Sequence, residues 1–377
     1  MKIRIINKIR ISDFYSVFLV IAYFLAATIF FYTVVLPNLK AGIVVGADSK
    51  TYILTARYYG NLNSIKLSDL FSLKFNFFGP VVLLIFTKYN YLLIYILNSL
   101  IFLCSSFVLF KYYNFNRLLF FALMFINPIT LLSLTTVNKE ILGMCSIMLL
   151  LSYIKSGRIW LLLLSFVLAF FTRWQQAVFI PVLLLYLSSI RLGRNLKWQA
   201  PMIVLVIVSV IYPFVGKYID FTGDVTRDGV QAQFNQVGGI LPFLNSLQNS
   251  FLYIISFLPK ALINYFGNFT RVADVFNYDI DFYNRMLVGH QVIMFLSIVW
   301  LFIKKKIRFK SVEFQIIFIY SVIYCVALTV NYRYFFPLYP LFVMLIVSKK
   351  FNLVTFKART RTQSRRLVLR LSSLRNN

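Results

Sequence analysis

Apolar runs of about twenty residues recur along most of this chain, and no other feature limits its fold as strongly. A run of that length matches the hydrocarbon thickness of a bilayer. Hydrophobic residues make up 60% of the 377 residues and charged residues only 13%, and a soluble domain could not hide so much apolar surface. The sequence therefore predicts an all-α, polytopic integral membrane protein.

About ten transmembrane helices are expected at the usual length of roughly twenty residues, some of them shorter. Two polar regions, 37–76 and 216–286, separate groups of spans and are expected to form outer loops that carry short helices. The stretches 77–88 and 251–266 are interrupted by Pro, Asn or Lys, so each is either a span or an interfacial or re-entrant helix. The clear apolar runs lie near 15–36, 91–110, 118–137, 141–154, 158–172, 176–190, 200–215, 287–303, 313–331 and 337–348.

Cations gather on one side of the predicted membrane. The formal net charge is +28, and the Lys and Arg residues fall mostly between apolar runs and at the two ends of the chain. This is the positive-inside pattern, so we expect cytoplasmic N- and C-termini and no nucleic acid partner. The prediction is one membrane domain over 1–350 and a basic cytoplasmic tail over 351–377, which would lie against anionic lipid.

The acidic residues fall mostly on the opposite, outer side, which is where we expect the chemistry. In the first outer loop, a helix beginning near Asp48 would place a carboxylate, two hydroxyls and two phenols on one face. Such a face beside a membrane suits a sugar; alternatively, Asp48 only caps an interfacial helix. The residues of this predicted face are Asp48, Thr51, Tyr52, Thr55 and Tyr59.

Three cations lie in short outer turns between apolar runs, where a cation near hydrocarbon costs up to about 2.5–3.5 kcal/mol. These residues are Lys139, Arg173 and Arg333. They either snorkel to headgroups, form a salt bridge such as Arg173 with Glu140, or converge on a phosphate. Residues of the types that stack on sugars and hydrogen-bond to them lie nearby, namely Asn138, Trp174, Gln175, Gln176, Tyr332 and Tyr334.

The remaining reactive residues give weaker patterns. His290 is the only histidine and is expected to be a satisfied polar group rather than a base. The three cysteines lie inside apolar runs, without the spacing of a metal site or a disulfide. Asp279 and Asp281, with Asp274 nearby, could gather a divalent cation, but carboxylates at i and i+2 point apart. No cofactor is therefore predicted, and a divalent cation stays open.

Short motifs follow one another in a distinctive order along 1–350. They are Asp48 with Tyr52 and Ala56-Arg57, Phe78-Gly79-Pro80, Asn98, Asn127-Pro128, Asn138-Lys139-Glu140, Thr172-Arg173-Trp174-Gln175, and Tyr-Arg-Tyr before Pro-x-x-Pro at 332–340. In this order the chain resembles the multi-spanning GT-C type glycosyltransferases, which use polyprenyl-phosphate-linked sugars. The chain departs from the commonest pattern of that family because it lacks a clear paired acid directly beside Asp48.

The resemblance implies a catalytic role for two residues. Asp48 would act as the general base for the acceptor hydroxyl, and Arg173 would stabilise the departing phosphate together with Lys139 and Arg333. The missing paired acid leaves open the metal dependence and the identity of the base. The residues expected to bind substrate are Tyr52, Arg57, Lys139, Glu140, Trp174, Gln175, Arg271, Arg285, Tyr332 and Arg333.

The chain also resembles the bacterial O-antigen and capsule polymerases, which are Phe- and Leu-rich polytopic proteins with two sizeable outer loops. That resemblance implies a larger role for arginines of the second outer loop, namely Arg227, Arg271 and Arg285. The two resemblances differ in whether Asp48 or the arginines contribute most to the reaction rate.

Both resemblances imply a glycosyltransferase of surface polysaccharide assembly in the bacterial inner membrane. It would transfer a sugar or a repeat unit from a carrier such as undecaprenyl phosphate or pyrophosphate to an acceptor saccharide on the outer face. Its partners would be these saccharides, membrane lipid and other polysaccharide-assembly proteins. The alternative is a transporter or flippase for a lipid-linked oligosaccharide or an anion, although polar groups at mid-bilayer and matching halves would then be expected.

Overall fold

The computed structural model describes residues 11–41, 48–65, 75–191, 199–219, 240–267, 269–277, 279, 282–309, 311–327 and 332–348. The predicted tail 351–377 lies outside these residues, as do Arg227 and Asp281.

Every regular element in the described residues is helical, which confirms the all-α prediction. In chain order the elements are α1 (Ile11–Phe30), η1 (Phe31–Val35), α2 (Leu36–Lys40), α3 (Ser49–Tyr59), η2 (Leu62–Ser64), α5 (Phe75–Phe86), α6 (Tyr91–Tyr112), α7 (Arg117–Ile126), α8 (Pro128–Thr135), α9 (Glu140–Ser156), α10 (Ile159–Phe170), α11 (Trp174–Arg191), α12 (Gln199–Ile219), α14 (Ile240–Asn249), α15 (Tyr253–Phe266), η4 (Phe269–Val275), α16 (Phe282–Ile303), α17 (Val312–Tyr324), η5 (Tyr332–Leu338) and α18 (Tyr339–Val347).

Among the described residues, three helices are long and apolar enough to cross a membrane, namely Phe14–Lys40, Tyr91–Tyr112 and Phe282–Ile303. A fourth crossing is added if α7 and α8, which meet at an angle of 80°, form one broken span. Several shorter apolar helices pack beside them. The count of about ten spans goes beyond these helices and stays a prediction.

Large apolar side chains lie exposed along the outer helices α1 and α12. Soluble proteins rarely leave contiguous apolar surface of this extent in water, whereas a lipid environment suits it. The exposed side chains are Phe14, Val17, Phe18, Ile21, Leu25 and Ile29 on α1, and Met202, Ile203, Val206, Ile207, Val210, Ile211 and Phe214 on α12. Together with the long apolar helices, this surface indicates a membrane protein.

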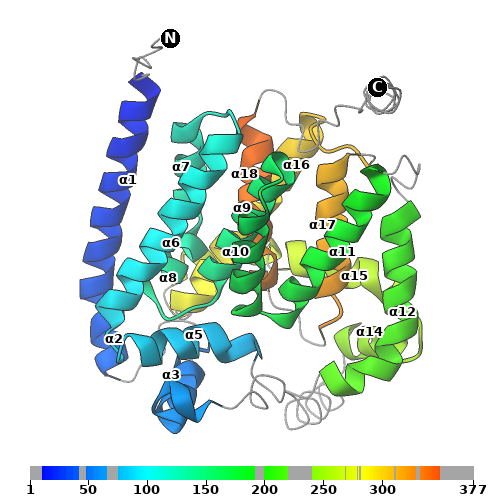
Figure 1. The fold of residues 1–377 in the computed structure, drawn as a ribbon, viewed down its shortest axis with the longest axis horizontal. Helices are drawn as coiled ribbons and strands as arrows, with labels where there is room; N and C mark the ends of the chain where they lie inside the picture. The colour runs from blue at the N-terminus through cyan, green and yellow to red at the C-terminus, as the bar shows by residue number, and fades with distance from the viewer. Residues whose placement is uncertain are drawn as a thin grey trace, which may run out of the picture.

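Short helices gather at the end of the bundle toward which α1 runs (Figure 1). There α3 and α5 lie together across the bundle rather than along it. Of the alternatives predicted for 77–88, the structure favours an interfacial helix, because α5 occupies this stretch beside α3. The stretch 251–266 forms α15, a helix of 14 residues with a buried polar face that includes Lys260 and an exposed apolar face that includes Leu258 and Leu262.

A break in the chain between α7 and α9 brings polar residues into the bundle. Asn127 accepts a hydrogen bond from the Ile129 N–H (3.1 Å) and Pro128 fills the first turn of α8, so a new helix begins in a new direction. At the other end of α8, the side-chain amide of Asn98 donates to the carbonyls of Ser133, Leu134 and Thr136, each at 3.3 Å. These contacts satisfy the carbonyls at the end of the helix and fix the turn before α9.

The helix α5 packs against the turn between α10 and α11 through a glycine. The Gly79 N–H donates to the Phe171 carbonyl at 2.9 Å, and the rings of Phe78 and Phe171 stack with centroids 5.1 Å apart. A Cβ atom at Gly79 would lie only 2.1 Å from the Phe171 carbonyl oxygen. The close approach therefore requires glycine at this position, and it holds the turn that carries Arg173.

Replacing Gly79 by alanine should lower the free energy of unfolding by about 1–3 kcal/mol, because a backbone atom must move to admit the methyl group. The measurement is the thermal midpoint of the purified protein in detergent. Gly289→Ala is the matched control, since its Cβ would meet the Pro128 ring at 3.3 Å, a contact that a small shift relieves. Equal midpoints for the Gly79→Ala protein and the wild type would contradict the observed packing.

Candidate functional site

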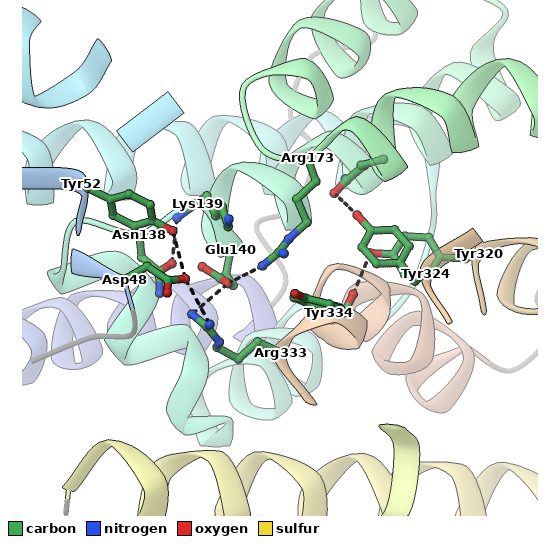
Figure 2. Close-up of polar contacts among 11 residues, drawn as sticks. Asp48, Tyr52, Asn138, Lys139, Glu140, Arg173, Tyr320, Tyr324, Arg333 and Tyr334 are labelled. Carbon is green, nitrogen blue, oxygen red and sulfur yellow. Dashed lines mark hydrogen bonds and ion pairs between the residues drawn. The ribbon is translucent and has the colours of Figure 1, made fainter. Parts of the chain in front are cut away.

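Four segments that are far apart in the sequence bring charged residues together near the end of the bundle that α3 and α5 cover (Figure 2). The N-terminus of α3 contributes Asp48, and the turn before α9 contributes Lys139 and Glu140. The turn between α10 and α11 contributes Arg173, and η5 contributes Arg333. We call these five residues the charge cluster. The structure thus brings together the three cations that the sequence analysis selected.

Asp48 faces the charge cluster instead of capping its own helix. It occupies the N-cap position of α3 with φ of 64°, and its side chain makes no capping hydrogen bond. Its Oδ2 accepts hydrogen bonds from the Tyr52 hydroxyl (3.4 Å) and from Arg333 Nη2 (3.3 Å). The prediction of a helix here is confirmed, whereas the alternative that Asp48 serves only as a cap is wrong.

The polar face predicted for this helix differs in part from the observed one. Ser49, Tyr52 and Ala56 are buried, while Thr51 is exposed. The helix packs through these small and aromatic side chains against α5 and α6, with Val81, Leu84 and Ile94 in the same apolar cluster. Tyr52 therefore reaches the charge cluster and Thr51 does not.

Glu140 lies between the two guanidinium groups. Its Oε1 is 3.0 Å from Arg173 Nη2 and 3.3 Å from Arg333 Nη1, and its side chain is 1% exposed. The predicted salt bridge of Arg173 with Glu140 is confirmed. The salt bridge and the gathering of the cations, which were given as alternatives, occur together. The other carboxylate oxygen, Oε2, is buried and has no hydrogen-bond partner among the residues that the structure describes.

Aromatic side chains close one side of the cluster. The guanidinium carbon of Arg173 lies 4.1 Å from the centroid of the Tyr334 ring, which is a cation–π contact. The Tyr320 hydroxyl donates to the Tyr334 carbonyl at 2.9 Å, and the Tyr324 hydroxyl donates to Gln176 Oε1 at 3.2 Å. These contacts, drawn in Figure 2, fix the position of Arg173 from the side opposite Glu140.

The charges of the cluster set the protonation of its members. Burial alone would raise the pKa of Asp48, but Arg333 and, further off, Lys139 and Arg173 outweigh burial and hold that pKa below its usual range. Burial lowers the pKa of Lys139 well below its usual value, and Arg173 adds to the shift while Glu140 and Asp48 oppose it. Arg173 and Arg333 balance the two carboxylates, and the cluster carries an excess positive charge when Lys139 is protonated, a state that a bound anion would favour.

The structure places the other predicted binding residues at varying distances from this cluster. Trp174 and Gln175 follow Arg173 directly at the start of α11, and Gln175 Oε1 is buried without a hydrogen-bond partner. Tyr332 begins η5, but its side chain lies outside the described residues. These three residues therefore lie next to members of the charge cluster in the sequence.

Three predicted arginines are not brought into the cluster. Arg57 lies on the exposed side of α3, and Arg271 is an exposed residue that pairs with Asp274 at 2.6 Å. Arg285 lies on α16 with its guanidinium carbon 5.8 Å from the Phe282 ring centroid. Their predicted part in substrate binding therefore has no support from the cluster geometry.

Some neighbours of the site had no signal in the sequence. Tyr283 of α16 lies beside Arg333, whose guanidinium carbon is 5.6 Å from its ring centroid, and the Tyr283 hydroxyl is buried without a hydrogen-bond partner. Tyr320 and Tyr324 stack on each other with centroids 4.2 Å apart and carry the contacts to Tyr334 and Gln176. With 24 tyrosines in the chain, nothing in the sequence distinguishes these three.

The weaker sequence patterns have structural outcomes as well. His290 is buried, with Nδ1 2.9 Å from the side-chain amide nitrogen of Asn127, so the expectation of a satisfied polar group is confirmed. Within the described part of the chain, no group of three or more His, Cys, Asp or Glu side chains could hold a metal ion. Asp274 pairs with Arg271, and Asp281 lies outside the described residues.

Comparisons with protein-family models, with curated proteins and with solved structures found no match for this chain.

Proposed function

We propose that this protein is a membrane glycosyltransferase that binds the phosphate of a lipid-linked saccharide at the charge cluster. The observation that carries the proposal is the convergence of Lys139, Arg173 and Arg333, each buried, around the carboxylates of Asp48 and Glu140. Burying these cations is costly, so a chain that gathers three of them at one end of its helices needs a compensating anion. A phosphate matches the guanidinium fork and the charge excess.

The two carboxylates have different environments and we assign them different parts. Glu140 is held between two guanidinium groups and is 1% exposed, so its part is to fix the two arginines. Asp48 is 37% exposed and held by a single guanidinium, so a substrate can reach it. Its lowered pKa keeps it ionised throughout the neutral range, and the same shift makes the carboxylate a weaker base.

The proposed transfer follows from this division. An acceptor hydroxyl oxygen attacks the anomeric carbon of the donor sugar, and its proton passes to Asp48. The bond between the anomeric carbon and the phosphate oxygen breaks, and the electron pair leaves with the phosphate. Arg173, Arg333 and Lys139 stabilise the charge that develops on that oxygen, which is electrostatic stabilisation of the transition state by groups already in place.

The arrangement of basic turns supports an outer location for the cluster. Arg158 lies over the Tyr112 ring at 5.8 Å, and the ammonium of Lys306 donates to three carbonyls at the end of α18. These basic turns lie at the end of the bundle away from α3 and α5 (Figure 1). By the positive-inside rule that end would be cytoplasmic, in accord with about ten spans and two outer loops.

The test is an assay in reconstituted vesicles, with purified protein, a mixture of polyprenyl-linked saccharides and products separated by size. We expect a lengthened or newly decorated saccharide, lost with Asp48→Asn and with Arg173→Ala when both proteins are shown to be folded and inserted. A product that survives Asp48→Asn but not Arg173→Ala would assign the rate to the arginines, as in a polymerase.

Two outcomes of this assay would overturn the proposal. Normal product from both variants would show that the charge cluster takes no part in the reaction. Movement of intact lipid-linked saccharide across the bilayer without a new glycosidic bond would identify a flippase instead, because buried cations serve an anion pathway equally well.

A further inference from the structure

A further buried cation, Lys260, lies outside the charge cluster, on α15. Lys260 is 1% exposed, and its ammonium donates to Gln248 Oε1 and to the Ala327 carbonyl, the latter at 3.3 Å. Gln248, on α14, is itself fully buried and donates from Nε2 to the Val326 carbonyl at 2.6 Å. Side chains from two helices thus bind the two carbonyls that follow the end of α17.

These carbonyls belong to the chain that leads into η5. Val326 and Ala327 come just after α17, and η5 begins at Tyr332 and carries Arg333. The same helices hold η5 from further along, because the Tyr265 ring of α15 lies 4.3 Å from the Phe335 ring. Side chains of α15 therefore contact described residues of the chain both before and after Arg333, at Ala327 and at Phe335.

Arg333 can bridge Asp48 and Glu140 only if η5 is positioned accurately. Its two terminal nitrogens each lie 3.3 Å from a carboxylate oxygen, one on Asp48 and one on Glu140. A displacement of η5 by about 1 Å would lengthen both contacts beyond the distance at which charged groups pair well. Whatever fixes the start of this segment therefore also decides whether Arg333 can bridge the two carboxylates.

The chemistry at Lys260 suits such an anchor. The carbonyls at the end of a helix carry partial negative charge, and an ammonium is favourable there. An ionisable side chain buried among apolar helices is retained for function more often than for stability. Lys260 makes its described contacts with an amide oxygen and a backbone carbonyl.

We propose that Lys260 is a positioning residue for Arg333, acting through the carbonyls of Val326 and Ala327 together with Gln248. This inference rests on the proposed function where the affinity for pyrophosphate is measured, and is independent of it where the thermal midpoint is measured. Lys260 fixes the end of α17, the end of α17 fixes the start of η5, and η5 holds Arg333 against Asp48 and Glu140.

The chain offers a matched control in Lys306. Its ammonium also binds backbone carbonyls at the end of a helix, those of Leu345, Ile346 and Ser348 at 2.9, 2.8 and 2.6 Å. Those carbonyls lie at the C-terminal end of α18, at the opposite end of the bundle (Figure 1). Lys306→Met therefore removes the same type of interaction without reaching η5.

The experiment is a double-mutant cycle of Lys260→Met with Arg333→Gln, read out by the affinity for inorganic pyrophosphate and by the thermal midpoint. In the wild-type background, Lys260→Met should weaken pyrophosphate binding at least about tenfold, because Arg333 no longer bridges the carboxylates. In the Arg333→Gln background the same change should have little further effect. Lys306→Met should leave the affinity unchanged in both backgrounds.

Equal losses of affinity from Lys260→Met in both backgrounds, or the same loss from Lys306→Met, would overturn the inference. If Lys260→Met does not fold, Gln248→Leu and Lys260→Arg replace it, with a loss expected from the first and recovery of at least half the wild-type affinity from the second. If the wild type does not bind pyrophosphate, the proposed anion site fails. The thermal midpoints still test whether Lys260 positions Arg333. Additive shifts of the midpoint for Lys260→Met and Arg333→Gln would show that the two residues are not coupled and would overturn the inference.

Discussion

Replacing Glu140 by glutamine should lower the free energy of unfolding by about 3–5 kcal/mol, the cost of breaking a buried ion pair from one side. Glu140 is the carboxylate shared by Arg173 and Arg333, so its neutralisation leaves both buried guanidinium groups without their common partner. Asp48 would then face three cations alone. The measurement is equilibrium unfolding of the purified protein in detergent or nanodiscs.

The control for this change is Asp274→Asn, which removes the carboxylate of the exposed pair with Arg271. Exposed pairs contribute about 0.2–1 kcal/mol, so the control should remain close to the wild type. Glu140→Asp keeps the charge but shortens the side chain and should fall between the two. If Glu140→Gln proved as stable as Asp274→Asn, the two arginines would not depend on Glu140 in the folded protein.

Replacing Arg333 by glutamine should reduce turnover in the vesicle assay by about 10²–10³-fold, the usual cost of losing one preorganised charge-stabilising donor. Arg333 contacts both Asp48 and Glu140, so its removal also frees Asp48 from the cluster. Arg333→Lys should recover only part of the rate, because an ammonium is a point charge without the geometry of the fork. Initial rates at saturating and at limiting donor separate the effect on turnover from the effect on binding.

Arg271→Gln is the matched control for Arg333→Gln, since it removes an exposed arginine that already pairs with Asp274. We expect its turnover to equal that of the wild type. A large loss with Arg271→Gln and none with Arg333→Gln would move the reaction from the buried charge cluster to the second outer loop, as the resemblance to the polymerases implies.

The sequence by itself determined the class of the fold. Apolar runs of membrane length predicted helices, and the described residues are helical throughout their regular elements. A break between those runs also predicted the polar turn at Thr172-Arg173, which separates α10 from α11. The run predicted over 118–137 was wrong as one straight helix, because Asn127 caps a new helix at Pro128 and α7 and α8 meet at 80°. These features are local, because they depend on side chains that cap, break or fill a helix within a few residues.

The sequence also identified the three cations of the site, because placing a cation near hydrocarbon is energetically costly. Lys139, Arg173 and Arg333 stood out because a cation among apolar helices needs a partner, and that argument requires no knowledge of the fold. The same argument could not separate Arg333 from Arg271 or Arg285, since all three lie in or beside polar segments. Only the packing shows that Arg333 is 4% exposed while Arg271 is paired on the surface.

The tertiary structure alone decided which residues meet. Asp48 and Arg333 are in contact across 285 positions of the chain, and no local pattern encodes a contact of that separation. The close approach at Gly79, the amide of Asn98 on the end of α8, and the anchor of Lys260 on the end of α17 align the segments that carry the charge cluster. Each is a contact between helices that hydrophobic periodicity leaves unspecified, because periodicity records which face of a helix is apolar and not which neighbour that face packs against.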